Sequence, residues 1–170
     1  MLTIRPEQFD DADSIGAVHR AAFPTDAEAR LVDRLRAHGN ARVSLVAVLG
    51  GQIVGHVLFS PVSLVSSDTC SNGLGLAPLA VLPAQQRRGI GSALVREGLA
   101  VCRRQNWPFV VVLGHPAYYP RFGFMRAGAV GVANEYGVDE QFMVLELQSG
   151  SLPVSGGLVK YGPEFAEFAR

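Results

Sequence analysis

The chain has 170 residues, of which 48% are apolar and 18% charged, and its formal net charge at pH 7 is zero. This length and composition favour one well-buried globular domain over residues 1–170 and argue against disorder. A neutral chain lacks the excess of Lys and Arg that nucleic-acid binding normally requires, so we expect no nucleic-acid partner.

The sequence gives no sign of export or membrane insertion. Residues 1–13 carry three aspartates where a signal peptide would need an apolar stretch. The longest apolar run, 74–84, contains two prolines and is shorter than the ~20 residues that a membrane helix requires. Cys70 and Cys102 form no metal-binding spacing and no disulfide framework. We therefore expect a cytoplasmic protein with reduced thiols, no membrane association and no metal.

The first sixty residues predict one strand, then two helices, then two strands: a strand at 2–5, helices at 10–22 and 27–38, and strands at 43–49 and 53–60. Asp10 provides a cap for the first helix, and Leu31 and Leu35 share one face of the second. The pair Gly50-Gly51 is typical of a hairpin turn between the last two strands.

The second half continues with a polar loop and further elements: a loop at 66–73, a strand at 74–82, a helix at 89–105, and strands at 109–113, 142–147 and 157–161. Pro78 removes a backbone donor, so we expect the strand at 74–82 to be bulged or locally unpaired. The apolar run 109–113 is typical of a buried strand that lies parallel to 74–82 across a helical crossover.

The segment Gln86-Arg87-Arg88-Gly89-Ile90-Gly91 lies between an expected strand and an expected helix. Amides at a helix start lack helical partners and favour anions, while the glycines allow close backbone approach and the arginines supply charge. The segment therefore predicts a phosphate cradle. It does not fit a dinucleotide fingerprint, because position 94 is a leucine, nor a Walker loop, because no lysine lies nearby.

The spacing Gln-x-x-Gly-x-Gly after an apolar strand resembles the pyrophosphate motif of the GNAT superfamily of N-acetyltransferases, which bind acetyl-CoA. A second segment, Tyr119 to Phe124, is similar to the Tyr-x-x-x-Gly-Phe segment of that superfamily. The two motifs come in the expected order, separated by one helix and one strand.

This resemblance implies an α/β fold with a mixed central sheet of about six to seven strands and helices on both faces. It covers a core at residues 1–147 and leaves a C-terminal extension at 148–170. The implied donor is acetyl-CoA, and the implied cofactor-binding residues are Leu79, Ala80, Val81, Gln86, Arg87, Arg88, Gly89, Ile90, Gly91, Ser92, His115, Tyr119 and Phe122.

Acetyl transfer to an amine requires an acid for the leaving thiolate and a route for the amine proton. The resemblance makes Tyr119 the acid, since a phenol is protonated at neutral pH. Many members carry a glutamate on the strand before the phosphate loop, but no Asp or Glu occurs between Asp68 and Glu97. Glu28 and His56 are the candidate bases, and water is a third route.

The expected reaction is direct attack without a covalent enzyme intermediate, because Cys102 lies on an apolar helix face where a thiol is inert. Four acidic residues would attract an ammonium: Asp26, Glu28, Glu135 and Asp139. We expect a small amine, an amino acid, or a protein N-terminus or lysine as acceptor. The alternative is an acyl-CoA-binding sensor without efficient turnover. The apolar residues of 157–168 also allow a homodimer.

Overall fold

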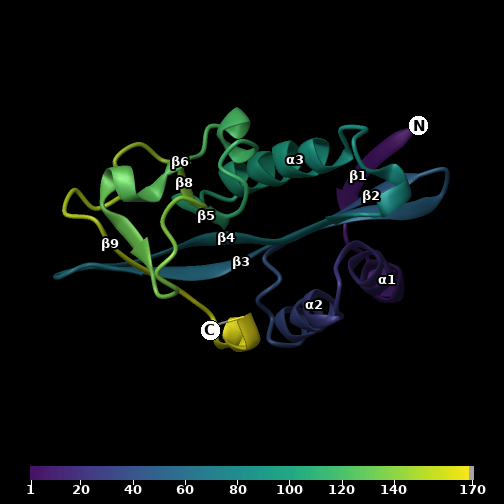
Figure 1. The fold of residues 1–170 in the computed structure, drawn as a ribbon, viewed down its shortest axis with the longest axis horizontal. Coiled ribbons are helices and arrows are strands. Elements are labelled where there is room, and N and C mark those ends of the chain that lie inside the picture. Colours follow the sequence, from purple (N-terminus) through teal and green to yellow (C-terminus); the bar gives the residue numbers. More distant parts are fainter. Residues whose placement is uncertain (169–170) are drawn as a thin grey trace. The chain divides into compact units, whose positions relative to one another are not determined.

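A computed structural model describes residues 1–168 as a mixed α/β fold with strands in both orientations, which confirms the predicted fold class (Figure 1). The three α-helices in this range are α1 (Ala12–Ala22), α2 (Ala27–Ala37) and α3 (Ile90–Arg104). The strands are β1 (Leu2–Pro6), β2 (Val43–Leu49), β3 (Gln52–Val65), β4 (Cys70–Val81), β5 (Phe109–Leu113), β6 (Met125–Arg126), β7 (Val132–Asn134), β8 (Phe142–Glu146) and β9 (Gly157–Tyr161).

The chain divides into two compact units, each built from two segments. The first unit comprises Met1–Ser60 with Ala77–Val101, and the second comprises Pro61–Leu76 with Cys102–Arg170. Strands β3 and β4 contribute residues to both units.

In the first unit, β1, β2 and the first part of β3 form an antiparallel meander. Leu2 pairs with Leu49 at one end of the β1–β2 ladder, and β2 pairs with β3 from Val43↔Phe59 to Leu49↔Gln52. Helices α1 and α2 lie on one side of these strands and α3 lies on the other (Figure 1). The helices bury an apolar stripe, because Ile15 of α1, Leu35 of α2 and Leu94 of α3 are all fully buried.

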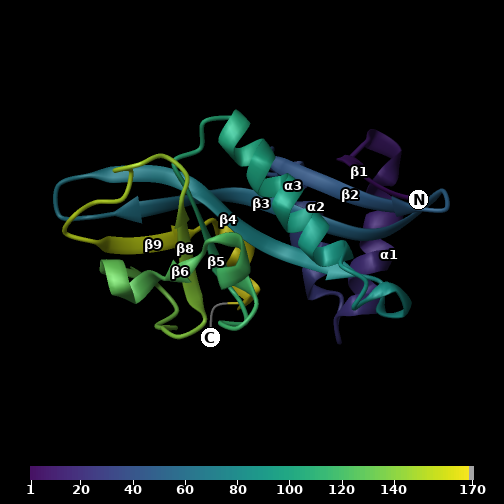
Figure 2. The same cartoon turned by 90° about the horizontal axis from the view of Figure 1, so that it is seen from above.

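Small residues allow α3 to approach β3 closely. Seen from above, α3 runs across the strands (Figure 2). A side chain at Gly98 would place its Cβ 2.4 Å from the Phe59 ring, and one at Gly55 would place it 3.0 Å from Leu94. Cβ atoms essentially never approach other atoms to 2.4 Å and seldom to 3.0 Å, so Gly98 above all sets the distance between helix and strand.

In the second unit, β5 pairs in parallel with β4 at Leu74↔Val110 and Gly75↔Val111, as the crossover pattern predicts. On its other side, β5 is antiparallel to β8, and β8 is antiparallel to β6. The buried side chains of this unit are Val62, Leu64, Phe109, Val111, Ala127, Val132, Phe142, Val144 and Val159.

Two sequence expectations were wrong in detail. The loop expected at 66–73 ends early, because β4 begins at Cys70 and continues through Pro78 without interruption. The short strands β6 and β7 were not predicted, and they bring the sheet to nine strands within residues 1–168.

The C-terminal extension is part of the sheet rather than an appendage. Strand β9 pairs antiparallel with Val62–Val65 of β3 and parallel with β7, and its Val159 is fully buried. The last two residues of the extension, 169–170, lie outside the described range.

Candidate active site

The turn from Gln86 to Gly89 leads directly into α3 in the first unit. Gly89 has a φ of +81°, and nothing in the described chain lies within 4 Å of the position that a Cβ would take there. At the start of α3, the Ala93 amide donates a helical hydrogen bond to the Gly89 carbonyl at 3.0 Å. The amides of Ile90, Gly91 and Ser92 therefore belong to the first turn, where a helix has its positive dipole end.

The side chain of Gln86 braces this turn. Its Nε2 donates a hydrogen bond to the Val81 carbonyl at the end of β4, at 2.9 Å. Leu79 is half-buried, whereas Ala80 and Val81 are buried. Gln86 thus contacts the strand that the resemblance assigns to the cofactor.

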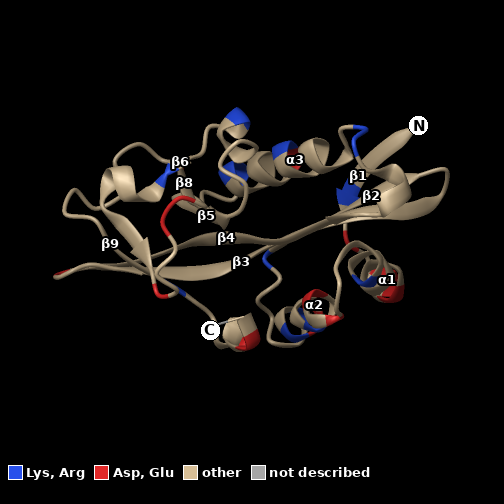
Figure 3. Ribbon diagram, viewed as in Figure 1, with Lys and Arg blue, Asp and Glu red and all other residues tan. Residues whose placement is uncertain are grey.

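Two arginines of the turn project into solvent. Arg87 and Arg88 are exposed, and Arg87 has a left-handed φ of +64°. Arg88 contacts the Gln85 side chain at 3.3 Å. The segment between β4 and α3 carries these two arginines and no acidic residue (Figure 3). Its electrostatic potential therefore favours an anion.

In the second unit, Tyr119 starts a 3-10 turn, Tyr119–Phe122, that ends at Gly123 with a φ of +99°. The residue is 8% exposed, and its ring makes an edge contact with Phe124, with ring centroids 5.8 Å apart. Burial and, to a smaller extent, the neighbouring Tyr118 raise the pKa of Tyr119 to about 12. The phenol therefore keeps its proton at neutral pH, as an acid must.

The neighbours of Tyr119 form an aromatic cluster. The Tyr118 ring packs edge-on against Tyr119 at 5.0 Å, and Phe122 packs at 6.2 Å. A Cβ at Gly114 would lie 2.3 Å from the Tyr119 ring, so the absence of a side chain there makes room for it. His115 is exposed, and its carbonyl accepts the amide of Tyr118 at 3.0 Å.

Glu28 lies in the first turn of α2, as the sequence predicts. The residue is half-buried, and its Oε1 is shielded from solvent and has no hydrogen-bond partner in the range 1–168. A shielded carboxylate oxygen without a donor is costly. It can accept a hydrogen bond from an amine.

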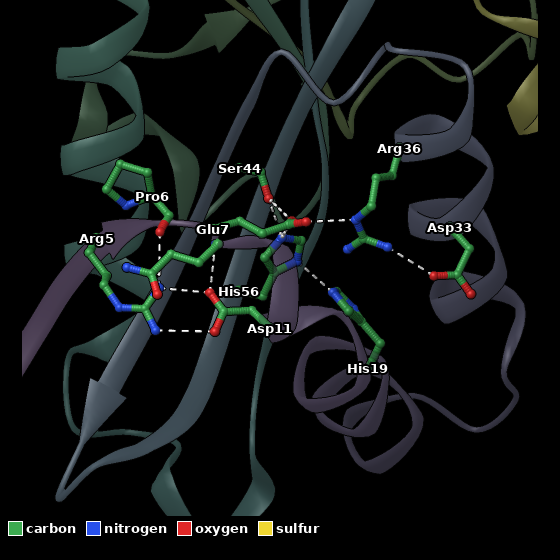
Figure 4. A network of polar contacts seen from close by, with 10 residues as sticks. Arg5, Pro6, Glu7, Asp11, His19, Asp33, Arg36, Ser44 and His56 are labelled. Carbon is green, nitrogen blue, oxygen red and sulfur yellow. Dashed lines mark hydrogen bonds and ion pairs between the residues drawn. The ribbon is translucent and has the colours of Figure 1, made fainter.

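His56 lies on β3 and is fully buried. Its Nδ1 is 2.8 Å from Nε2 of His19, and its Nε2 is 2.8 Å from the Ser44 hydroxyl (Figure 4). Desolvation lowers the pKa of His56 well below its usual value, and the charges of His19 and Arg36 lower it further. Both ring nitrogens are engaged, so His56 cannot touch an acceptor directly.

Sequence reasoning did not find His19, Ser44, Glu7 and Arg36, which surround His56 in Figure 4. One available signal was the spacing of His19, which lies four residues after Ile15 on the buried stripe of α1.

The acidic residues expected at the acceptor entrance are largely paired. Asp26 forms an ion pair with Arg30, and Asp139 forms one with Arg126 at 2.9 Å. The carboxylate of Glu135 accepts the amide of Tyr161 at 2.9 Å.

Cys102 is buried, and desolvation raises the pKa of its thiol to about 12. Its sulfur is therefore a protonated packing atom rather than a nucleophile. Within the described residues, no group of three or more His, Cys, Asp or Glu side chains could hold a metal ion. None of the helices described is long and apolar enough to cross a membrane.

Comparison with known proteins identifies the family. The model of the acetyltransferase (GNAT) family matches residues 10–124. The chain belongs to the GNAT acetyltransferase family. This confirms the resemblance carried by the two motifs and the expectation of an N-acetyltransferase enzyme.

The similarity of this GNAT protein to its relatives extends over the whole chain. It is 38% identical over 169 residues to YhbS of Escherichia coli strain K12, an uncharacterized N-acetyltransferase, and the matched region covers 98% of this chain and 100% of the relative. The crystal structure of E. coli YhbS in complex with CoA has a TM-score of 0.91 and 37% identity, covering 99% of this chain and 96% of that chain. A GNAT acetyltransferase from Brucella melitensis in complex with acetyl-CoA has a TM-score of 0.81 and 36% identity, covering 97% of this chain and 98% of that chain.

Proposed function

We propose that this GNAT protein transfers an acetyl group from acetyl-CoA to a primary amine of a small molecule or a protein. The observation that carries the proposal is the open, basic turn at Gln86–Gly89, which precedes the first amides of α3. The relatives solved with CoA and acetyl-CoA support this choice of donor. A cytoplasmic location and a homodimer remain predictions.

The turn fits a pyrophosphate on chemical grounds. The space beside Gly89 lets phosphate oxygens reach the backbone, and the amide of Gly91 lies in the first turn, at the positive end of the helix. Arg87 and Arg88 would add charge-assisted hydrogen bonds. We further propose that backbone groups of 79–81 pair with the pantetheine amides, as an added strand does.

Tyr119 is the proposed acid for the leaving thiolate. Its raised pKa keeps the proton in place until a thiolate develops, and the aromatic cluster around it limits the positions of its ring. His115 and Phe122 remain predicted cofactor contacts from the same segment.

The amine must shed a proton as it bonds to the thioester carbon. Glu28 offers an oxygen without a donor, so we propose that it accepts a hydrogen bond from the neutral amine and orients it for the attack. His56 has no exposed atom, so any part that it plays must pass through its neighbours. With no covalent intermediate, the amine attacks the thioester directly.

A second candidate function is an acyl-CoA-binding sensor without turnover. The absence of any acidic residue from 69 to 96, where many family members carry a glutamate, favours it. Release of CoA that depends on an added amine separates the two functions, because a sensor binds the donor without releasing thiol.

The donor site is tested with Gly89→Asp and a matched control, Gly39→Asp. Both glycines have a positive φ, +81° at Gly89 and +72° at Gly39. At both positions the space that a Cβ would occupy is open to 4 Å within the described chain. The two variants therefore add similar backbone strain and the same charge. We expect calorimetry to show acetyl-CoA binding by the wild type and by Gly39→Asp, and none by Gly89→Asp. Unchanged affinity in folded Gly89→Asp would contradict the cradle assignment.

A further inference from the structure

The first unit contains a buried pair of histidines from two different elements. His19 of α1 and His56 of β3 are both fully buried, and their rings meet edge-on at 86° (Figure 4). Nε2 of His19 lies 2.8 Å from Nδ1 of His56. Since only one hydrogen can lie between these two nitrogens when both rings are neutral, one ring donates and the other accepts.

The pair continues into a chain of polar groups that reaches solvent. The Ser44 hydroxyl lies 2.8 Å from Nε2 of His56 and 2.5 Å from Oε1 of Glu7. The direct distance from His56 Nε2 to Glu7 Oε1 is 3.8 Å, so Ser44 bridges the two groups. The Glu7 side chain is 14% exposed, and its Oε2 accepts Nε of Arg36 at 2.6 Å.

The carboxylate at one end sets the direction of every hydrogen bond. A carboxylate can only accept, so the Ser44 hydroxyl donates to Glu7 and must accept from Nε2–H of His56. Nδ1 of His56 then carries a lone pair and accepts Nε2–H of His19. Nδ1 of His19 is left with a lone pair, and no described residue donates to it.

The surroundings keep both rings neutral at pH 7. Desolvation lowers the pKa of His19 to about 4, and the nearby Arg36 contributes to this shift. The charged groups that face the pair are Glu7 after β1, and Arg36 of α2, which also binds Asp33. An imidazole that donates at one nitrogen and accepts at the other can take up one proton while it passes another on, so it holds a full charge only briefly.

We propose that His19, His56 and Ser44 form a relay that takes the proton of the attacking amine, through one water molecule, at Nδ1 of His19 and delivers a proton to Glu7. This inference rests on the proposed acetyl transfer. As the amine nitrogen bonds to the thioester carbon, it gives a proton to the water, which gives one to Nδ1 of His19. The Nε2 proton of His19 moves to Nδ1 of His56, the Nε2 proton of His56 moves to Ser44, and the Ser44 proton moves to Glu7.

The proton count of this step balances. One proton enters the chain and one arrives at Glu7, and both rings end in the Nδ1–H form. After the product leaves, the reverse passage with water as the final acceptor at His19 restores the starting tautomers. In this relay the proton ends on the Glu7 carboxylate, which is partly exposed, and not on the buried histidines, whose basicity is low.

The first test is the tautomeric state, which needs no acceptor. Long-range proton–nitrogen NMR of the wild type at pH 7.5 should place the hydrogen on Nε2 of both His19 and His56. A hydrogen on Nδ1 of His56, or a charged ring, would reverse or block the chain and overturn the relay.

The second test uses Ser44→Ala and a matched control, Ser60→Ala. Ser60 lies on β3, and its buried hydroxyl has no hydrogen-bond partner among residues 1–168. The assay measures CoA thiol release with the most active member of a panel of primary amines. We expect Ser44→Ala to lower kcat by about 10-fold to 100-fold, which is at or below the lower limit of the ~10²-fold to 10⁴-fold range for general acid–base catalysis, because water can replace part of the relay. The KM for acetyl-CoA should not change, and Ser60→Ala should match the wild type.

Two further readouts separate a relay from a structural role. Ser44→Thr keeps a hydroxyl and should restore kcat, and the deficit of Ser44→Ala should shrink at higher pH, where bulk base removes the proton. A kcat of Ser44→Ala within twofold of wild type, or a deficit that is independent of pH, overturns the relay. If the wild type releases no CoA with any amine of the panel, the proposed function fails, and the NMR result alone decides the relay geometry.

Discussion

The buried histidine pair predicts that the protein loses stability in acid well before its carboxylates are protonated. The pKa of His19 is lowered from 6.5 to about 4 in the folded state. Between these values the unfolded chain binds a proton at this position and the folded chain does not. Stability from His19 is therefore fully present above about pH 6.5 and is lost as the pH falls towards 4.

The size of the loss follows from that pKa difference. Each unit of difference is worth about 1.4 kcal/mol, so His19 accounts for about 3 kcal/mol across this range. His56 acts in the same direction, because its pKa is also lowered by burial. Asp11, whose pKa is lowered by its bond to Arg5, loses its contribution only below its ordinary value of 3.8. The histidine effect is therefore separable from that of Asp11.

The assay is urea unfolding at pH 7.5, 6.5, 5.5 and 4.5 for the wild type and His19→Phe. The phenylalanine ring can keep the stacking on Phe23 but cannot take up a proton. We expect the variant to be less stable at pH 7.5 by about 1–3 kcal/mol, because Nδ1 of His56 loses its donor. Its stability should also depend less steeply on pH between 6.5 and 4.5. A wild-type free energy of unfolding that stays flat over this range would refute the reasoning.

Three further predictions concern the proposed active site. Tyr119→Phe should lower kcat by ~10²-fold with unchanged acetyl-CoA affinity, while Tyr118→Phe serves as the control. A loss of kcat in Tyr118→Phe alone would mean that Tyr118, not Tyr119, is the acid. Gly114→Ala places a Cβ 2.3 Å from the Tyr119 ring, so we expect a lower Tm and a lower kcat, and crystals with an unmoved ring would contradict this. Glu28→Gln should raise the KM for the amine by about 10-fold with kcat within a few-fold of wild type; a kcat loss of 100-fold at unchanged KM would make Glu28 the base and not the relay.

Features that depend on short stretches of sequence were predictable. The strands at Val43–Leu49 and Phe109–Leu113 were predicted at their observed bounds, because apolar runs of that length between turn residues have few other solutions. The turn at Gln86–Gly91 was predictable for the same reason, since its glycines and the start of α3 are adjacent in the chain. Membership of the family followed from two such local motifs and their order.

Features that depend on distant residues were decided by the tertiary structure. The sequence carries no local signal that β9 pairs with β3, because nearly a hundred residues separate Val62 from Tyr161. The same holds for His19 and His56, which are 37 positions apart, and for the Ser44 bridge to Glu7. By itself the sequence determined the family, and it predicted a phosphate-binding turn and a candidate acid. Only packing decided that His56 is buried and which groups it contacts, because burial and hydrogen-bond partners depend on which elements the fold brings together.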